Sequence, residues 1–204
     1  MSKGFNRRVI VGISGASGIA YGICALRLLQ SLSIETHLVM TRSATVALGH
    51  EIPLKLRDVH ALASVVHRND DVGASIASGS YPTLGMLIAP CSIRSLSEIA
   101  YGVTSSLITR AADVVLKERR RLVLMVRETP LHVGHLRAMT QAAECGAVIM
   151  PPVPALYARP SSIDEIVTHT VGRALDLLGI VNDAVARWGE DGSFAQQISV
   201  PSVE

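Results

Sequence analysis

Short runs of branched aliphatic residues alternate with helix-like stretches along most of the chain. Such runs predict strands at residues 9–13, 34–40, 84–89, 121–126 and 147–150. Helices are predicted from residue 19 onward and at 44–49, 58–67, 105–119, 135–145 and 161–178, the last with Ser161 or Ser162 as its N-cap and Gly179 after its end. Strands that alternate with helices join by right-handed crossovers. The pattern predicts an α/β protein with a doubly wound, mostly parallel sheet.

The composition fits a sheet that is covered on both faces. Hydrophobic residues make up 49% of the 204 residues and charged residues only 18%, as expected for buried parallel strands. The length suits a single domain over residues 1–204, with flexible tails at 1–6 and 189–204. So little charge also predicts that other subunits cover part of the surface, which makes a homo-oligomer the expected state.

Charge and cysteine usage narrow the class of protein. The formal net charge is +2, and no basic stripe is interleaved with aromatic residues, so nucleic acid is not an expected partner. Neither a signal peptide nor a membrane-spanning segment is apparent in the sequence. Cys24, Cys91 and Cys145 are scattered, which favours a reducing cytoplasm over a disulfide framework.

A glycine-punctuated turn follows the first predicted strand. Gly12, Gly15 and Gly18 separate that strand from a helix that begins near Ile19. Backbone N–H groups and the positive end of the helix dipole would meet there, which suits a phosphate group. The spacing differs from G-x-G-x-x-G and no P-loop lysine follows. The turn therefore predicts a mononucleotide phosphate, with a plain tight βα connection as the alternative.

The carboxyl ends of the strands are where ligands bind in such sheets. Hydroxyl groups, prolines or an Arg-Glu pair follow each predicted strand end, in residues 15–17, 41–43, 90–95, 127–130 and 151–157. Because the carboxyl ends of parallel strands share one edge, we expect a binding site there.

Six ordered motifs carry a resemblance to a known family. They are Gly15-Ala16-Ser17-Gly18, Ser78-Gly79-Ser80, Pro90-Cys91-Ser92-Ile93-Arg94-Ser95-Leu96, Arg110-Ala111-Ala112-Asp113, Lys117-Glu118-Arg119-Arg120 and Val126-Arg127-Glu128-Thr129-Pro130-Leu131. With residues 151–160 and Arg187-Trp188-Gly189, the chain closely resembles the UbiX-type flavin prenyltransferases, formerly called aromatic-acid decarboxylase small subunits. The resemblance spans nearly the whole chain.

The resemblance implies a fold, a reaction and partners. The fold is the flavodoxin-like Rossmann fold of the homo-oligomeric flavin-containing decarboxylase group, typically assembled as a dodecamer. The reaction transfers a dimethylallyl group from dimethylallyl monophosphate to N5 and C6 of reduced FMN. The product, prenylated FMN, serves a separate UbiD-type decarboxylase.

The same resemblance assigns candidate residues to the site. The FMN set is Gly15, Ala16, Ser17, Thr41, Ser92, Ile93, Arg94, Ser95 and Arg127. The set for the prenyl donor is Ser78, Ser80, Arg110, Lys117, Tyr157 and Arg173, with Lys117 supplied across a subunit boundary. The catalytic set is Glu51 and Glu128 for proton handling, Lys117, and Trp188, which with Tyr157 would face the allylic cation.

These residue types suit the chemistry. Breaking the allylic C–O bond leaves a cation beside a departing phosphate, which lysine and arginine stabilise. Aromatic faces stabilise the cation, and bond formation on the flavin requires a base. A diphosphate-using enzyme would need an aspartate-rich magnesium motif, but Asp70-Asp71 is the only pair of adjacent aspartates. The sequence therefore fits a monophosphate donor that binds without a metal. His132 and His135 lack a third ligand, so no metal is expected.

Several residues have plainer alternative roles. Lys117 and the arginines after it can simply complement a helix C-terminus. Cys91 is more readily explained by buried packing than as a nucleophile, and Glu128 can form an ion pair with Arg127. Trp188 can cover a hydrophobic surface. Three positions depart from the family pattern: Thr41 replaces serine, Val126 replaces proline, and Tyr81 follows the Ser-Gly-Ser loop where some members have a small residue.

Two other functions remain open on the sequence. An FMN-dependent cysteine decarboxylase shares the fold, but carries Pro-Ala-Ser-Ala-Asn-Thr where this chain has residues 90–95, and uses a histidine base with no secure match here. A non-catalytic flavin-binding subunit of a decarboxylase is the second alternative, against which the retention of Lys117, Glu128, Tyr157 and Arg173 argues.

Overall fold

A six-stranded, all-parallel sheet forms the centre of the molecule. The computed structural model describes residues 7–185 and 187. The strands are β1 (Arg8–Ile13), β2 (Glu35–Met40), β3 (Val65–His67), β4 (Gly85–Cys91), β5 (Arg121–Val126) and β6 (Ala147–Ile149), in the order β3-β2-β1-β4-β5-β6. Without the short edge strand β3, the order is the flavodoxin-like one. The predicted α/β fold class is confirmed.

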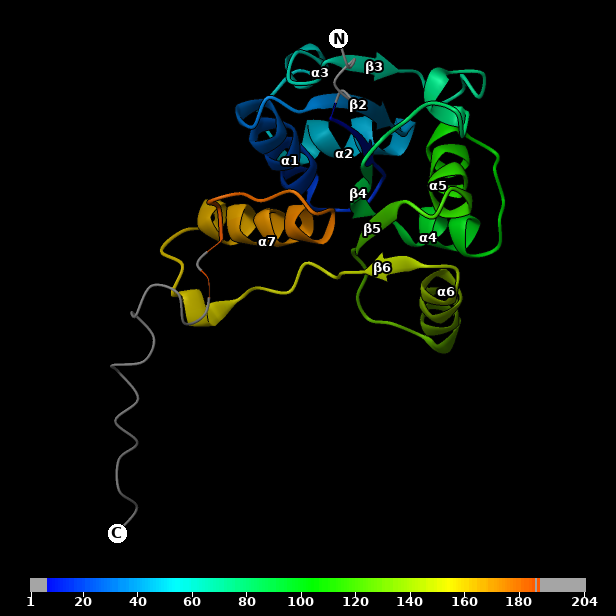
Figure 1. Ribbon diagram of the computed structural model, residues 1–204. Coiled ribbons are helices and arrows are strands. Elements are labelled where there is room, and N and C mark those ends of the chain that lie inside the picture. Colours follow the sequence, from blue (N-terminus) through cyan, green and yellow to red (C-terminus); the bar gives the residue numbers. More distant parts are fainter. Residues whose placement is uncertain (1–6, 186, 188–204) are drawn as a thin grey trace.

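Helices cover both faces of this sheet (Figure 1). They are α1 (Ile19–Ser31), α2 (Arg42–Glu51), α3 (Leu56–His60), α4 (Ile93–Ala100), α5 (Leu107–Lys117), α6 (Val133–Glu144) and α7 (Ile163–Leu177), with 3₁₀ turns η1 (Ser75–Ala77) and η2 (Leu156–Ala158). One face packs against α1 and α7, and the other against α4, α5 and α6. After β6 the chain runs as an extended segment to η2 before it returns as α7 (Figure 1).

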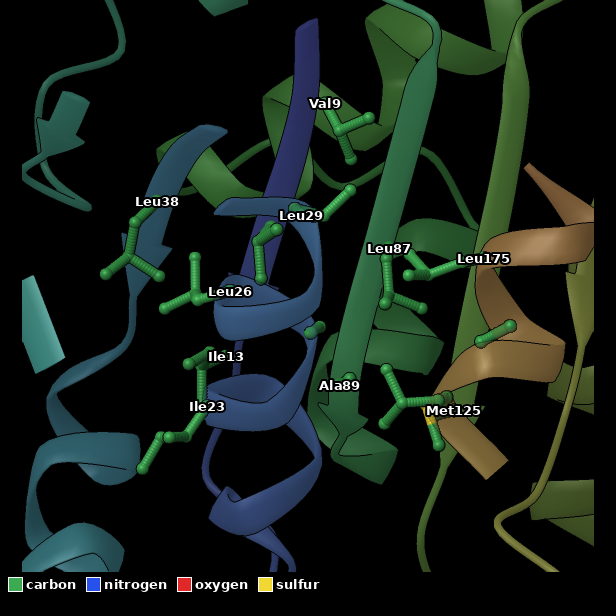
Figure 2. Close-up of a cluster of buried hydrophobic side chains, with 14 of the residues drawn as sticks. Val9, Ile13, Ile23, Leu26, Leu29, Leu38, Leu87, Ala89, Met125 and Leu175 are labelled. Atoms are coloured by element: carbon green, nitrogen blue, oxygen red, sulfur yellow. The ribbon is translucent and has the colours of Figure 1, made fainter. Parts of the chain in front are cut away.

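Side-chain alternation along the strands explains the two cores. Val9 and Ile13 of β1 join the cluster beneath α1 and α7, whereas Ile10 joins the opposite cluster. Figure 2 shows Leu26 of α1 and Leu175 of α7 above the strands of the first cluster. Every residue of β4 is buried, as the continuous apolar run predicted.

Two elements differ from the sequence prediction. A helix was expected over 58–67, but α3 ends at His60, and Val65–His67 form β3 beside β2. Its β-branched Val65 and Val66 suit an edge strand. Helix α4 was not predicted, because the segment that follows β4 was interpreted only as a polar strand end. Leu96, Ile99 and Ala100 bury one side of this short helix.

The ends of α7 match the prediction. The Ser162 side chain accepts a hydrogen bond from the Glu165 backbone N–H at 3.2 Å, and Gly179 ends the helix with a φ of 78°. The expected tails, 1–6 and 189–204, lie outside the described residues. Within the described part of the chain, none of the helices has both the length and the apolar character needed to cross a membrane.

Candidate active site

A cavity of about 500 Å³ opens at the carboxyl ends of β1, β2, β4 and β5. It lies at the point where the strand order reverses, between β1 and β4, which is where doubly wound sheets bind ligands. Its volume suits a small molecule or cofactor. The lining residues are Gly15, Thr41, Arg42, Ser43, Asn69, Ser92, Ile93, Arg94, Ser95, Glu98, Ser105, Ser106, Ile108 and Glu128.

Ser14 joins the two strands at the base of this cavity. Its side chain is fully buried, and its hydroxyl donates to the Pro90 carbonyl at 3.0 Å and accepts from the Ser92 N–H at 2.7 Å. The backbone N–H of Ser14 also donates to Pro90 O, at 3.1 Å. These bonds hold the segment that starts at Ser92 against the end of β1. Ser14 is not among the site residues predicted from the sequence, although its place directly after an apolar strand was a usable signal.

Three helices begin at the cavity wall. Thr41 caps α2 by accepting from Ala44 N at 3.1 Å, and Ser92 caps α4 by accepting from Ser95 N at 3.3 Å. Helix α5 begins after Ser106, which also lines the cavity. The first N–H groups of a helix lack intrahelical partners and carry a positive partial charge. Arg42 and Arg94 also line the cavity, and Arg94 pairs with Glu98 of the same lining at 2.9 Å. The helix starts and these guanidinium groups make this wall suited to an anion such as a phosphate.

The start of α1 does not present the same free site. Glu51 Oε2 accepts hydrogen bonds from Gly18 N and Ile19 N, each at 2.9 Å. A carboxylate of the chain itself therefore lies where the glycine-rich turn predicted a phosphate. Gly15 instead allows a close approach between the turn and α2, because an added Cβ would lie 2.2 Å from the Ser43 Cβ. Of the expected residues in this turn, Gly15 lines the cavity and Ala16 and Ser17 do not.

Glu128 and Arg127 follow β5 at the same edge. Glu128 lines the cavity, and its carboxylate accepts from Thr129 N at 3.0 Å. The alternative of an ion pair with Arg127 finds no support among the ion pairs of the described residues. Burial raises the pKa of Tyr21 in α1, and the nearby Arg127 guanidinium opposes that rise.

Part of the expected donor set lies at the amino ends of the strands, opposite the edge where the cavity opens. Lys117 ends α5 directly before β5, and β5 has six residues, so its two ends are roughly 20 Å apart at ~3.3 Å per residue. Ser78 and Ser80 lie beside Lys117: their hydroxyls are 2.9 Å apart, and a Cβ on the intervening Gly79 would lie 2.7 Å from Lys117 Nζ. The ammonium of Lys117 also pairs with Glu118 at 2.5 Å.

Tyr157 and Arg173 form a third group, on α7 and the turn before it. The Tyr157 ring meets the His169 ring edge-on, with centroids 6.0 Å apart. His169 and Arg173 are four residues apart on α7 and so share one helix face. Arg173 pairs with Asp176 at 2.8 Å, and Arg110 pairs with Asp113 at 2.7 Å outside the cavity lining.

A single subunit therefore brings together only part of the expected site. The cavity unites Gly15, Thr41, Ser92, Ile93, Arg94, Ser95 and Glu128. The donor residues Ser78, Ser80, Arg110, Lys117, Tyr157 and Arg173 do not line it. Trp188 lies outside the described residues. Lining residues that were not predicted from the sequence include Asn69, Glu98 and Ser106; of these only Ser106 had a signal, as a serine before an apolar helical run.

Cys91 is a packing residue. It is fully buried at the end of β4, and burial raises the pKa of its thiol to about 12. The thiol therefore stays protonated at neutral pH, which removes the nucleophile interpretation. Among the residues that the structure describes, no group of three or more His, Cys, Asp or Glu side chains is arranged to hold a metal ion.

Comparison with known proteins shows the family of the chain. A family model described as Flavoprotein matches residues 2–175. Flavin prenyltransferase UbiX of Escherichia coli (strain K12) is 60% identical over 185 residues, which cover 89% of this chain and 98% of that protein. A protein of the same name from Thauera aromatica is 53% identical over 181 residues, covering 89% of this chain and 93% of the relative.

Solved structures extend the likeness to three dimensions. AnUbiX (PadA1), crystallised with FMN and dimethylallyl pyrophosphate, superposes with a TM-score of 0.88 at 45% identity, covering 90% of this chain and 97% of that one. The cysteine decarboxylase SpaF reaches a TM-score of 0.58 at 18% identity, covering 70% of this chain and 82% of the other, which shows a shared fold alone. The chain belongs to the Flavoprotein family and, within it, to the UbiX flavin prenyltransferases.

Proposed function

We propose that this chain transfers a dimethylallyl group from dimethylallyl monophosphate to N5 and C6 of reduced FMN. The cavity at the strand-order reversal carries the proposal, because it combines an anion-binding wall with a carboxylate, Glu128, at the same sheet edge. Membership in the UbiX flavin prenyltransferases supports the reaction type.

The residues present fit an FMN molecule. We assign its phosphate to the wall where α2 and α4 begin, with Thr41, Ser92 and Ser95 as hydroxyl partners and Arg94 as the counter-charge. The flavin ring is then assigned to the part of the site near Gly15, Arg127 and Glu128. Ala16 and Ser17 complete the turn on which Gly15 lies.

Proton transfer is assigned to carboxylates at this edge. Prenyl transfer breaks the allylic C–O bond, releases phosphate and replaces protons on the flavin, so a base is required. Glu128 lines the cavity and is the proposed base. Glu51, held by the N–H groups of Gly18 and Ile19, is proposed to act with it from the start of α1.

We propose that the donor half of the site is completed between subunits. Lys117, Ser78, Ser80 and Arg110 would come from one subunit, and Tyr157 with Arg173 from another, because α5 and α7 cover opposite faces of the sheet within one chain. Exposed apolar side chains such as Val133, Val153 and Ile163 leave surface for subunit contacts. A similar structure from Escherichia coli O157:H7, at 43% identity and a TM-score of 0.86, is described as dodecameric, and we propose the same assembly here.

The remaining assignments complete the proposal. Trp188, with Tyr157, is proposed to face the allylic cation. Prenylated FMN is proposed to leave for a UbiD-type decarboxylase. The cysteines Cys24, Cys91 and Cys145 are all unpaired, which supports a reaction in a reducing cytoplasm.

The decisive experiment is an anaerobic incubation of the purified protein with reduced FMN and dimethylallyl monophosphate, followed by mass analysis of the extracted flavin. A gain of one prenyl unit is expected, and Glu128→Gln should slow it by roughly 10²-fold or more. Parallel reactions with dimethylallyl diphosphate test the donor. Bound but unmodified flavin with both donors would contradict the proposal and favour the flavin-binding subunit.

A further inference from the structure

Arg120 holds the loop that carries Ser78 and Ser80. Its Nη2 donates to the Gly79 carbonyl at 2.7 Å, and its Nη1 donates to the Tyr81 carbonyl at 2.8 Å and to Thr83 Oγ1 at 3.5 Å. One guanidinium therefore binds two carbonyl oxygens that are two residues apart. The planar fork of arginine suits such a pair of acceptors, whereas the single ammonium of lysine does not.

Arg120 is itself fixed by the end of α5. Arg119 adopts a left-handed conformation with a φ of 54°, its N–H donates to Leu116 O at 2.9 Å, and Arg120 N donates to Val115 O at 2.9 Å. These two bonds form a Schellman motif, which closes the helix and fixes the direction of the chain. The backbone of Arg120 is therefore as rigid as the helix that it follows.

The same loop also lies against Lys117 and Glu118, at the end of α5. A Cβ on Gly79 would lie 2.1 Å from Glu118 Oε1 and 2.7 Å from Lys117 Nζ, so the loop lies directly against the ends of these two side chains. Arg120 and Lys117 therefore both contact the loop, and both are held by the rigid turn that ends α5.

Tyr81 anchors the other end of the loop. Its hydroxyl lies 3.2 Å from His37 Nε2, and the Arg8 guanidinium lies 4.8 Å from its ring centroid. Tyr81 is one of the positions where the sequence departs from the family pattern. The tyrosine side chain, larger than the small residue of some family members, packs beside β2.

We infer that Arg120 is a positioning residue for the prenyl donor: it sets the Ser78 and Ser80 hydroxyls and the Lys117 ammonium on one surface. This inference rests on the proposed function, in which that surface binds the donor phosphate. Arg120 itself is engaged with loop carbonyls and does not need to touch the donor. Its loss should weaken donor binding while the FMN cavity, at the opposite edge of the sheet, is unaffected.

The test compares Arg120→Gln and Arg120→Lys with Arg119→Gln, which removes the same charge at the exposed neighbouring position. The measurements are kcat, the KM for dimethylallyl monophosphate, and the dissociation constant of FMN. Arg120→Gln should raise the donor KM about tenfold or more and leave FMN binding within about twofold, because two charge-assisted hydrogen bonds are lost. The donor KM of Arg120→Lys should lie between those of the wild type and Arg120→Gln. The donor KM of Arg119→Gln should equal that of the wild type.

Hydrogen exchange supplies a readout that does not depend on turnover. Peptides that cover residues 75–84 should exchange faster in Arg120→Gln than in Arg119→Gln, with exchange in β4 unchanged. A wild-type donor KM in Arg120→Gln overturns the inference, as does an equal loss of donor and FMN binding, which would show a general structural role. If Arg120→Gln does not fold, the donor KM of Arg120→Lys decides in the same way. A wild-type protein that transfers no prenyl group contradicts the proposed function instead.

Discussion

Ser14 shows how one buried hydroxyl organises the site at the residue scale. Its hydroxyl donates to Pro90 O and accepts from Ser92 N–H, so its removal leaves the Ser92 N–H and the buried Pro90 carbonyl each with one partner fewer. We expect Ser14→Ala to lower the free energy of unfolding by about 1–3 kcal/mol and to weaken FMN binding, because Ser92 begins the wall that is proposed to bind the FMN phosphate.

Urea unfolding and an FMN titration test this expectation. Ser31→Ala is a suitable control, since its hydroxyl bonds only to Leu28 O at an exposed helix end. Ser14→Thr keeps the hydroxyl and should retain more FMN affinity than Ser14→Ala. Equal FMN affinity in Ser14→Ala and the wild type would show that the Ser92 segment keeps its place without this bond.

His67 makes stability depend on pH. Burial and the adjacent His37, whose Nδ1 lies 2.9 Å from His67 Nε2, lower the pKa of His67, while Asp71 opposes the shift. The folded protein then binds fewer protons than the unfolded chain at pH values between the lowered pKa and the ordinary value of about 6.5. This contribution to stability is present above pH ~6.5 and is lost as the pH falls through the folded-state pKa.

The urea midpoint measured from pH 8 to pH 5 tests this. It should fall on acidification in the wild type, and less steeply in His67→Gln, whose amide can still reach His37 but does not titrate. His50→Gln, at an exposed position in α2, should retain the wild-type slope. An unchanged slope in His67→Gln would assign the pH dependence to other groups.

At the scale of elements, the approach of the glycine turn to α2 defines the width of the site. A methyl group on Gly15 would lie 2.2 Å from Ser43 Cβ and 3.2 Å from the Ser43 backbone, so α2 must move. We expect Gly15→Ala to weaken FMN binding by about tenfold or more, because α2 carries Thr41 and Arg42 at its start.

Gly49→Ala is the matched control, because a Cβ at Gly49 has nothing within 4 Å. It should leave FMN affinity unchanged and raise helix stability by about 0.5–1 kcal/mol, since glycine is unfavourable in a helix. Isothermal titration with FMN measures the first effect. Tight binding by Gly15→Ala would show that α2 shifts without consequence for the site.

The elements also show where pattern reasoning reaches its limit. The long periodic segments, such as α7 and the continuous apolar strand β4, were predicted because each carries enough residues to establish a period. The residues Val65–His67 were misassigned because three residues establish none, and their pairing with β2 depends on a strand nearly thirty positions away. Helix α4 was missed because its capping serine was interpreted only as a ligand.

At the scale of the whole molecule, the separation of the donor residues predicts complementation between subunits. Lys117→Ala and Arg173→Ala should each be nearly inactive, because each removes a cation proposed to bind the donor phosphate. When the two variants are co-expressed, random assembly restores an intact pair of residues at about a quarter of the sites if the two residues come from different subunits.

Prenyl transfer by the co-purified assembly checks this, with separate tags to confirm that both variants are present. Recovery of about a quarter of the wild-type rate is expected. Activity no higher than that of either variant alone would place Lys117 and Arg173 in one subunit's site and contradict the proposed assembly of the site.

The sequence by itself determined the fold class, the family and the sheet edge at which the candidate cavity lies, because apolar periodicity and ordered local motifs are properties of contiguous residues. Only the tertiary structure decided which of those motifs meet. It placed Glu51 at the start of α1, Ser14 between β1 and β4, and Arg120 on the Ser78–Tyr81 loop. It also placed Lys117 away from the cavity. Such contacts join residues that are tens of positions apart, and no local pattern encodes the packing of helices and strands that brings them together.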